Sequence, residues 1–199
     1  MPGTQRQKQK AETRKHIIRT ALRQFAQDGL TVARTSDIAK AAGVSHGTVF
    51  AHFPTREDLL DAAIEEFGLR ITCRLHELAD GKSGMREILE AHLQGIGENE
   101  GFYTRLVSEG RLLKESSRHT FIMIQSAVSF HIIQVAEREM QAGKIRPMPL
   151  DLLFNTWVGL VHYYLSNGDL FAPGSPVLER YGEKLTEHYI RLISMKGEC

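Results

Sequence analysis

The sequence predicts an all-α protein, because apolar residues recur at three- and four-residue spacing along most of the chain. No segment shows the strict alternation of apolar and polar residues that is typical of a half-buried strand. Glycine, proline and asparagine, the residues of turns, fill the breaks between the apolar stretches. With 199 residues, the chain is long enough for one large domain or two small ones.

The apolar spacing places the expected helices along the chain. The first helix runs over about 12–28 and ends at Gly29, where a C-cap glycine is favoured. Residues 1–10 are polar and basic, and we expect them to form a disordered tail. The later helices are expected at about 36–42, 46–52, 56–79, 85–97, 100–113, 116–142, 149–167 and 175–195.

Charge is distributed unevenly, although the formal net charge is only +1. Residues 1–60 carry ten Lys and Arg against five Asp and Glu, whereas the rest carries 15 against 19. A basic front end on a mildly acidic body is typical of a protein whose one end meets phosphate. A solvated face with a basic tail would explain the same charge pattern.

Three features predict a cytoplasmic protein. The two cysteines, Cys73 and Cys199, fit free thiols in a reducing cytosol better than a disulfide. The N-terminus lacks the apolar core of a signal peptide. The longest apolar stretch, Leu152–Leu165, contains polar residues and is too short to span a bilayer. We therefore expect no membrane partner.

The segment from Thr35 to Phe53 meets the structural requirements of a helix-turn-helix. Two helices that cross steeply need a small residue where their backbones approach, and Ala39 supplies it. Gly43 tolerates the positive φ of the turn, and Ser45 can cap the second helix. An ordinary helical hairpin is the alternative on turn chemistry alone. The apolar residues that would join the two helices are Ile38, Ala42, Val44 and Val49.

Three runs of residues extend this motif and carry a resemblance to a known family. They are Ile17-Ile18-x-x-Ala21-x-x-x-Phe25-Ala26-x-x-Gly29-Leu30, Thr35-Ser36-x-Ile38-Ala39-x-x-Ala42-Gly43-Val44-Ser45 and His46-Gly47-Thr48-Val49-Phe50-x-His52-Phe53-Pro54-Thr55-Arg56-Glu57-Asp58-Leu59-Leu60. The sequence from about Arg14 to Leu60 thus resembles the DNA-binding domain of the tetracycline-repressor (TetR) family. The resemblance is specific and covers about a quarter of the chain. It implies a three-helix helix-turn-helix domain over 11–55, a connecting helix over 56–79, and a larger helical domain for ligand binding and dimerisation over 80–199.

The resemblance also implies DNA-contacting residues. The start of the second short helix would enter the major groove of a double-stranded operator, and the other positions would hold phosphates. The family usually has Tyr where this chain has Phe50 and Lys where it has Arg56. Phe50 loses a hydroxyl bond to phosphate, whereas Arg56 keeps the cation. The implied DNA-contacting residues are Thr35, Ser36, Ser45, His46, Gly47, Thr48, Phe50, His52 and Arg56. The basic tail could add phosphate or minor-groove contacts through Arg6, Lys8, Lys10, Arg14 and Lys15, though a solubilising tail fits as well.

The larger domain has two implied tasks. Its last two helices, 149–167 and 175–195, would form a homodimer, and the first of them is apolar on more than one face. The preceding helices would enclose an apolar effector that releases the operator, although activators also occur in the family. Plain core packing is the alternative for each candidate effector-binding residue. These candidates are Phe102, Tyr103, Met123, Gln125, Phe130, His131, Trp157 and Tyr163.

Other classes of function have less support in the sequence. The nine histidines include no HExxH motif and no close pair at metal-ligand spacing, and the cysteines form no CxxC. No glycine-rich phosphate loop or nucleophile elbow occurs. We therefore expect no catalytic residues, no metal and no cofactor. The remaining alternative is a DNA-binding regulator that binds no small ligand and is controlled by a protein partner.

Overall fold

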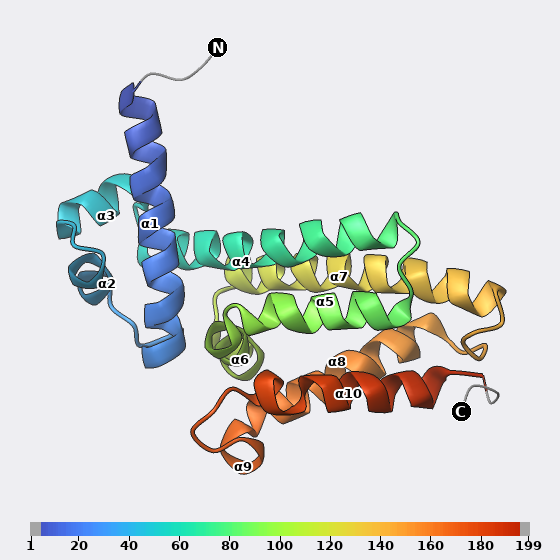
Figure 1. The fold of residues 1–199 in the computed structure, drawn as a ribbon. Coiled ribbons are helices and arrows are strands. Elements are labelled where there is room, and N and C mark those ends of the chain that lie inside the picture. Colours follow the sequence, from blue (N-terminus) through green and yellow to red (C-terminus); the bar gives the residue numbers. More distant parts are fainter. Residues whose placement is uncertain (1–4, 196–199) are drawn as a thin grey trace. The chain divides into compact units, whose positions relative to one another are not determined.

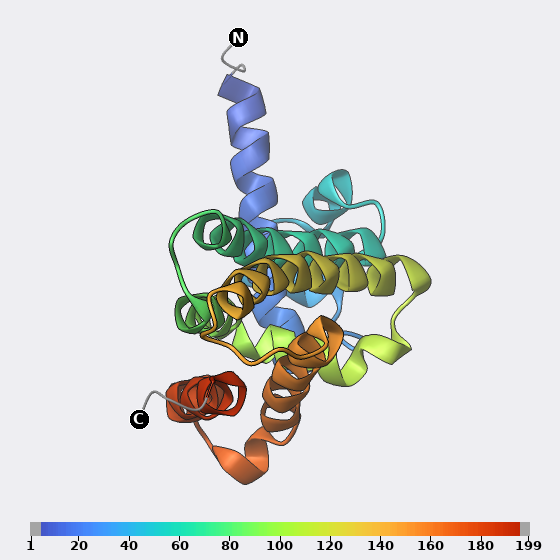
Figure 2. The ribbon, with the colours of Figure 1, turned by 90° about the vertical axis from the view of Figure 1, so that its right-hand side faces the viewer.

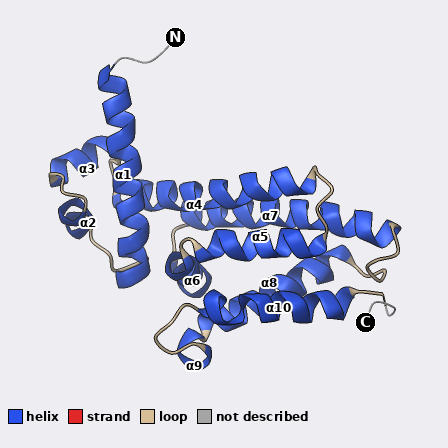
Figure 3. Ribbon diagram, viewed as in Figure 1, coloured by secondary structure: helices blue, strands red, loops and turns tan. Residues whose placement is uncertain are grey.

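A computed structural model describes residues 5–195, and these residues are helical almost throughout (Figures 1 and 3). Within this range no strand forms, and the β-type pairing is an isolated bridge between Ile145 and Ser194. The all-α prediction is confirmed. The elements are α1 (Gln5–Asp28), α2 (Thr35–Ala41), α3 (His46–His52), α4 (Arg56–Ala79), α5 (Met85–Gly97), α6 (Glu100–Glu109), the 3-10 helix η1 (Gly110–Leu112), α7 (Glu115–Gln141), α8 (Leu150–Ser166), α9 (Gly168–Phe171) and α10 (Val177–Ile193).

Two elements differ from the sequence-based expectation. Helix α1 begins at Gln5 rather than near residue 12, so the expected disordered tail is helical from Gln5, while residues 1–4 lie outside the described range. No glycine or proline lies between Gln5 and Asp28, so nothing in the sequence interrupts this helix. The helix expected over 100–113 ends at Glu109 and continues as the short η1.

The chain forms two compact units that differ from the expected domains. The first unit runs to Phe67 and also includes Gly101–Phe121, which contains most of α6. Phe102 joins the two parts, because its ring lies 6.3 Å from Phe25 of α1 and 5.7 Å from Phe67 of α4. These three side chains are almost completely buried. The core of this unit therefore includes a helix from beyond residue 80.

Polar contacts also hold α6 to the end of α1. Glu109 accepts a hydrogen bond from the amide of Leu30 at 2.8 Å and one from Arg105 at 3.0 Å. Arg105 in turn donates to the carbonyl of Ala26 at 3.3 Å. Gly29 has a φ of +94°, and a Cβ at this position would lie 3.0 Å from a Glu109 carboxylate oxygen. The turn after α1 therefore fits closely around Glu109.

The second unit comprises Gly68–Glu100 and the chain from Ile122 onward. In it, α10 runs beside α5 and α8 (Figures 1 and 2). Trp157 of α8 is fully buried, lies 5.1 Å from the ring of Tyr189, and donates from Nε1 to His92 Nδ1 at 3.1 Å. Burial lowers the pKa of His92 to about 3, with a smaller contribution from His162, so His92 is a neutral acceptor in this core.

By length and composition alone, α7 could cross a membrane, although only 22% of its most apolar window is buried. Three large apolar side chains of α7, Ile122, Met123 and Phe130, are more than half exposed. The same helix carries Gln125, Ser126, Ser129, Gln134 and charged residues near both ends. Its composition is therefore also compatible with a helix at a protein surface.

Replacing Glu109 with alanine should destabilise the protein by about 1–3 kcal/mol, because the Leu30 amide and Arg105 lose their partner. Urea unfolding at one fixed protein concentration measures this change in the free energy of unfolding. Glu12→Ala, which removes an exposed carboxylate from α1, is the matched control. Equal stability of the two variants would contradict the role assigned to Glu109.

Candidate nucleic-acid interface

The turn between α2 and α3 depends on one glycine and on the burial of two side chains. Gly43 has a φ of +65°, a conformation that costs other residues about 1–2 kcal/mol. The amide of Val44 donates to the carbonyl of Ala39 at 3.1 Å and closes the turn. Ile38 and Val49 are fully buried on the two helices. The helix-turn-helix expected from the sequence is therefore present.

Ser45 begins α3 as its N-cap. Its hydroxyl oxygen accepts a hydrogen bond from the amide of Thr48 at 3.0 Å, and it lies 2.8 Å from the Thr48 hydroxyl. The capping role predicted for Ser45 is confirmed. Ser45 is exposed and Thr48 is half-buried, and their contacts to DNA stay a prediction.

The starts of α2 and α3 share one exposed surface. Thr35 Oγ1 lies 3.0 Å from His46 Nε2, which links the two helix starts. The His46 ring packs edge-on against Phe50, which is 42% exposed, with a centroid separation of 4.7 Å. Ser36 and Gly47 are exposed beside them. We call these five residues the α2–α3 surface, and its size and polarity fit a surface that reads base edges.

His52, at the end of α3, is half-buried and lies near two cations of α1. Burial, together with the positive charges of Lys10 and Arg14, lowers its pKa below the usual 6.5. A neutral His52 can donate a hydrogen bond to phosphate but supplies no charge there. The Arg14 guanidinium lies 5.0 Å from the Phe53 ring centroid. The sequence alone suggests Lys10 and Arg14 only as possible DNA contacts of a basic tail. Their four-residue spacing is the signal that could have placed both on one face of a helix.

Arg56 has partners inside the protein. Its Nε donates to the carbonyl of Ala33 at 2.9 Å, and its other donated bond goes to the carbonyl of Leu30. Its guanidinium also lies 5.6 Å from the Phe25 ring centroid, and its side chain is 25% exposed. These contacts hold the loop between α1 and α2. The phosphate contact expected of Arg56 stays a prediction.

The eight candidate effector-binding residues are divided between the two units, and their part in effector binding stays a prediction. Phe102 and Tyr103 belong to the packed core of the first unit, where Tyr103 stacks on Phe67 at 5.5 Å. In the second unit Trp157 is fully buried and His131 nearly so, while Gln125 is half-buried. Met123, Phe130 and Tyr163 are more than half exposed. Two cavities of the second unit, one between α5 and α10 and one beside Gly84, Ile145 and Ile193, have none of the eight in their lining.

Comparison with known proteins agrees with this geometry. Residues 17–63 match the family model described as "Bacterial regulatory proteins, tetR family". The HTH-type transcriptional regulator AcrR of Shigella flexneri is 30% identical over 178 residues, which cover 82% of this chain and 81% of that protein. The HTH-type transcriptional repressor KstR2 of Mycobacterium tuberculosis is 24% identical over 170 residues, covering 80% and 84%.

Solved structures share the fold of this chain. The transcriptional regulator FadR from Bacillus subtilis, solved in complex with stearoyl-CoA, superposes with a TM-score of 0.73 at 19% identity, covering 88% of this chain and 97% of that one. At 19% identity the structural similarity supports the fold alone. The family assignment comes from the family model and from the relative that is 30% identical. The chain belongs to the TetR family of bacterial regulatory proteins, and it is a DNA-binding transcriptional regulator rather than an enzyme.

Proposed function

We propose that this protein is a repressor that binds a palindromic operator as a homodimer and leaves it when an apolar small molecule binds. The observation that carries this proposal is the α2–α3 surface, which a buried core and the Gly43 turn hold in place while its side chains stay exposed. The site of action is the bacterial cytoplasm, where the chromosome lies. A compact helical regulator also accounts for α7 without a membrane.

Dimerisation is supported by the outer face of α8. Leu152 and Tyr163 are 57% and 58% exposed, and Gly159 lies between them on the same helix face. The opposite face of α8 is buried against its own unit through Leu153, Trp157 and neighbouring residues. A helix that is apolar on both faces favours a second burial partner. A two-fold partner would place two α2–α3 surfaces on an inverted repeat.

An internal effector is supported by two polar atoms of α7. His131 Nδ1 and Gln134 Oε1 are buried and have no hydrogen-bond partner among the described residues. The two residues lie three positions apart, on one helix face. Buried polar groups normally have partners, so these atoms favour a ligand with a polar group on an apolar body. The names of two relatives point the same way, since one was solved with stearoyl-CoA and another is called a ketosteroid regulator.

Selection of bound DNA from a random pool should yield an inverted repeat. In the His46→Ala variant the preference for the selected base at one position in each half-site should fall by about 1–3 kcal/mol, because a base-edge contact is lost. Fluorescence anisotropy with the selected site and its single-base variants measures this preference.

Lys10→Ala is the contrasting variant for this experiment. It should weaken binding to all sequences alike and lower the slope of log Kd against log salt concentration by about one, as expected for a phosphate contact. A pool without an inverted repeat would contradict the proposal. Identical effects of His46→Ala and Lys10→Ala would contradict the division of roles.

The double variant Leu152→Asp/Tyr163→Asp should convert a dimer into a monomer, because it places charges in the proposed apolar interface. Sedimentation equilibrium measures the mass at several concentrations. Leu112→Asp, at a leucine that is 73% exposed on η1, is the control and should leave the dimer intact. A double variant that stays dimeric would place the interface elsewhere.

Titration of the operator complex with stearoyl-CoA or a ketosteroid should release the protein if either compound resembles the effector. Gln134→Leu should then weaken the response at least tenfold, because it removes a buried polar contact. Gln141→Leu, at an exposed position on the same helix, should leave the response unchanged. Failure of both compounds to lower operator affinity would favour the regulator controlled by a protein partner.

A further inference from the structure

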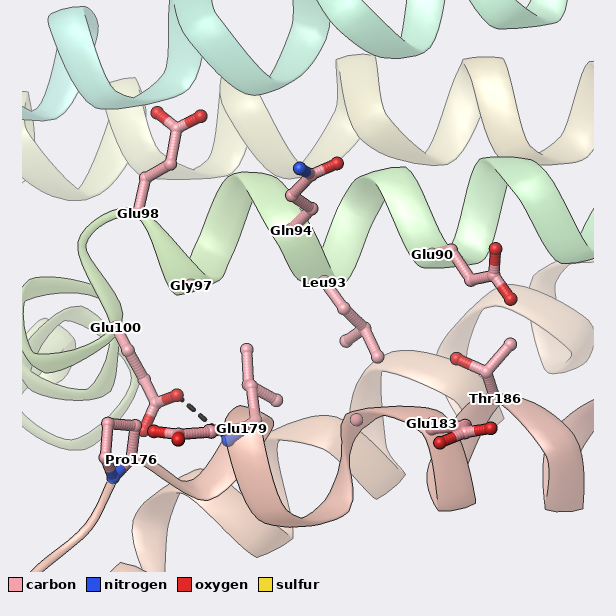
Figure 4. Close-up of a pocket in the computed structure, with 12 residues that line it drawn as sticks. Glu90, Leu93, Gln94, Gly97, Glu98, Glu100, Pro176, Glu179, Glu183 and Thr186 are labelled. Carbon is pink, nitrogen blue, oxygen red and sulfur yellow. Dashed lines mark hydrogen bonds between the residues drawn. The ribbon is translucent and has the colours of Figure 1, made fainter.

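Helices α5 and α10 of the second unit border a groove of about 570 Å³, a size that suits a small molecule (Figure 4). Its apolar lining includes Leu93 of α5 and Leu178 of α10, and Leu93 points toward α10. All charged residues in the lining are glutamates, namely Glu90, Glu98, Glu100, Glu179 and Glu183. The groove is therefore negatively charged and has no basic residue in its lining.

The register of the two helices explains why two carboxylates, Glu90 and Glu183, meet in this groove. Helices α5 and α10 run antiparallel (Figure 1), and Arg86 donates to Glu187 across them at 2.7 Å. One turn along each helix, Glu90 and Glu183 take the corresponding positions, and both line the groove. Arg86 lies 3.8 Å from Glu90 but is held more closely by Glu187. One turn of the two helices thus holds the Arg86–Glu187 ion pair, whereas the next turn holds two carboxylates, Glu90 and Glu183.

Two of the other glutamates have partners or point elsewhere. The Glu100 carboxylate accepts hydrogen bonds from the amides of Val177 and Leu178 at 2.6 and 2.9 Å, which caps α10 (Figure 4). Glu98 points away from α10 and lies 3.9 Å from Arg70. Over residues 5–195, by contrast, Glu183 has neither a hydrogen bond nor an ion pair, and Glu179, which also has neither, lies beside Glu100 at the other end of the groove from Thr186 (Figure 4). Glu90 and Glu183 are therefore the carboxylates best placed to meet a ligand.

A buried hydroxyl lies at the same end of the groove. Thr186 follows Glu183 by three residues on α10, and it is fully buried in the groove lining. Its Oγ1 has no hydrogen-bond partner in the described part of the chain, and in Figure 4 it points toward Leu93. Burying a hydroxyl without a partner is unfavourable. This atom independently indicates that a hydrogen-bonding ligand group belongs here.

We propose that the α5/α10 groove binds a protonated amine with an apolar body. The ammonium group lies between Glu90 and Glu183 and donates a third hydrogen bond to Thr186, which uses the three donors of a primary ammonium. The apolar body covers Leu93 and Leu178. An anionic ligand such as an acyl-CoA is excluded by charge, so this site differs from the effector site proposed on α7.

Isothermal titration of the full chain without DNA tests this inference with three probes that share an indole ring. Tryptamine carries an ammonium group, tryptophol a hydroxyl and indole-3-acetate a carboxylate. Tryptamine should bind at least tenfold more tightly than tryptophol, and indole-3-acetate should not bind. Equal affinities, or no binding of tryptamine up to about 10 mM, would overturn the proposal.

Two double variants with the same change of charge test whether tryptamine binds in the groove or is attracted by the overall charge of the protein. Glu90→Gln/Glu183→Gln should weaken tryptamine binding at least tenfold, whereas Glu65→Gln/Glu137→Gln makes the same charge change at exposed positions outside the groove and should not. Thr186→Val should lower tryptamine affinity while leaving the melting temperature of the free protein unchanged or higher. Unaltered binding by the first double variant would overturn the proposal. Operator binding is measured in parallel, because its loss or retention tests the repressor proposal and not this site.

Discussion

The left-handed conformation of Gly43 is the constraint on which the α2–α3 surface depends. It reverses the chain within a few residues, so that Ile38 and Val49 enter one core. The same reversal brings Thr35 within 3.0 Å of His46, although eleven positions separate them. A β-carbon at residue 43 would be strained in this conformation even though there is open space around it. The backbone turn and the packing of Ile38 and Val49 therefore position the two short helices, and the Thr35–His46 contact links their starts.

Helix α1 connects this turn to the rest of the first unit. His16 of α1 lies 3.0 Å from the carbonyl of Ala42 at the turn, and the other end of α1 is held by Arg105 of α6. A displacement of α6 would therefore act on the helix that supports the α2–α3 surface. The helix that the resemblance implies as the connection between the domains, 56–79, corresponds to α4 and would be one physical route from effector to DNA. The contacts of α6 with α1 provide a second physical route inside the same unit.

Most of the fold could be predicted from the sequence because helical periodicity and turn residues are local signals. The N-cap role of Ser45 and the turn at Gly43 are likewise local. The inward contacts of Arg56 could not be predicted, since they require carbonyl groups of a loop more than twenty residues away. The surroundings of the effector candidates could not be predicted either: Tyr163, nominated from composition, is more than half exposed on α8, and its part in effector binding stays a prediction. The placement of Glu90 and Glu183 in one groove depends on the register of two helices far apart in the chain.

In the proposed complex with DNA, affinity and specificity have separate physical sources. The α2–α3 surface contains no lysine or arginine, so it offers hydrogen bonds and ring contacts but little charge. Burial and the charges of Lys10 and Arg14 lower the pKa of His52 below its usual value, which favours its neutral form. Lys10 and Arg14 of α1 supply positive charge near the end of α3, and Arg34 and Lys40 are exposed cations before and on α2. Since salt-dependent affinity follows charge and base selection follows the groove contacts, we expect α1 to contribute to how tightly the protein holds DNA and α3 to determine which sequence it holds.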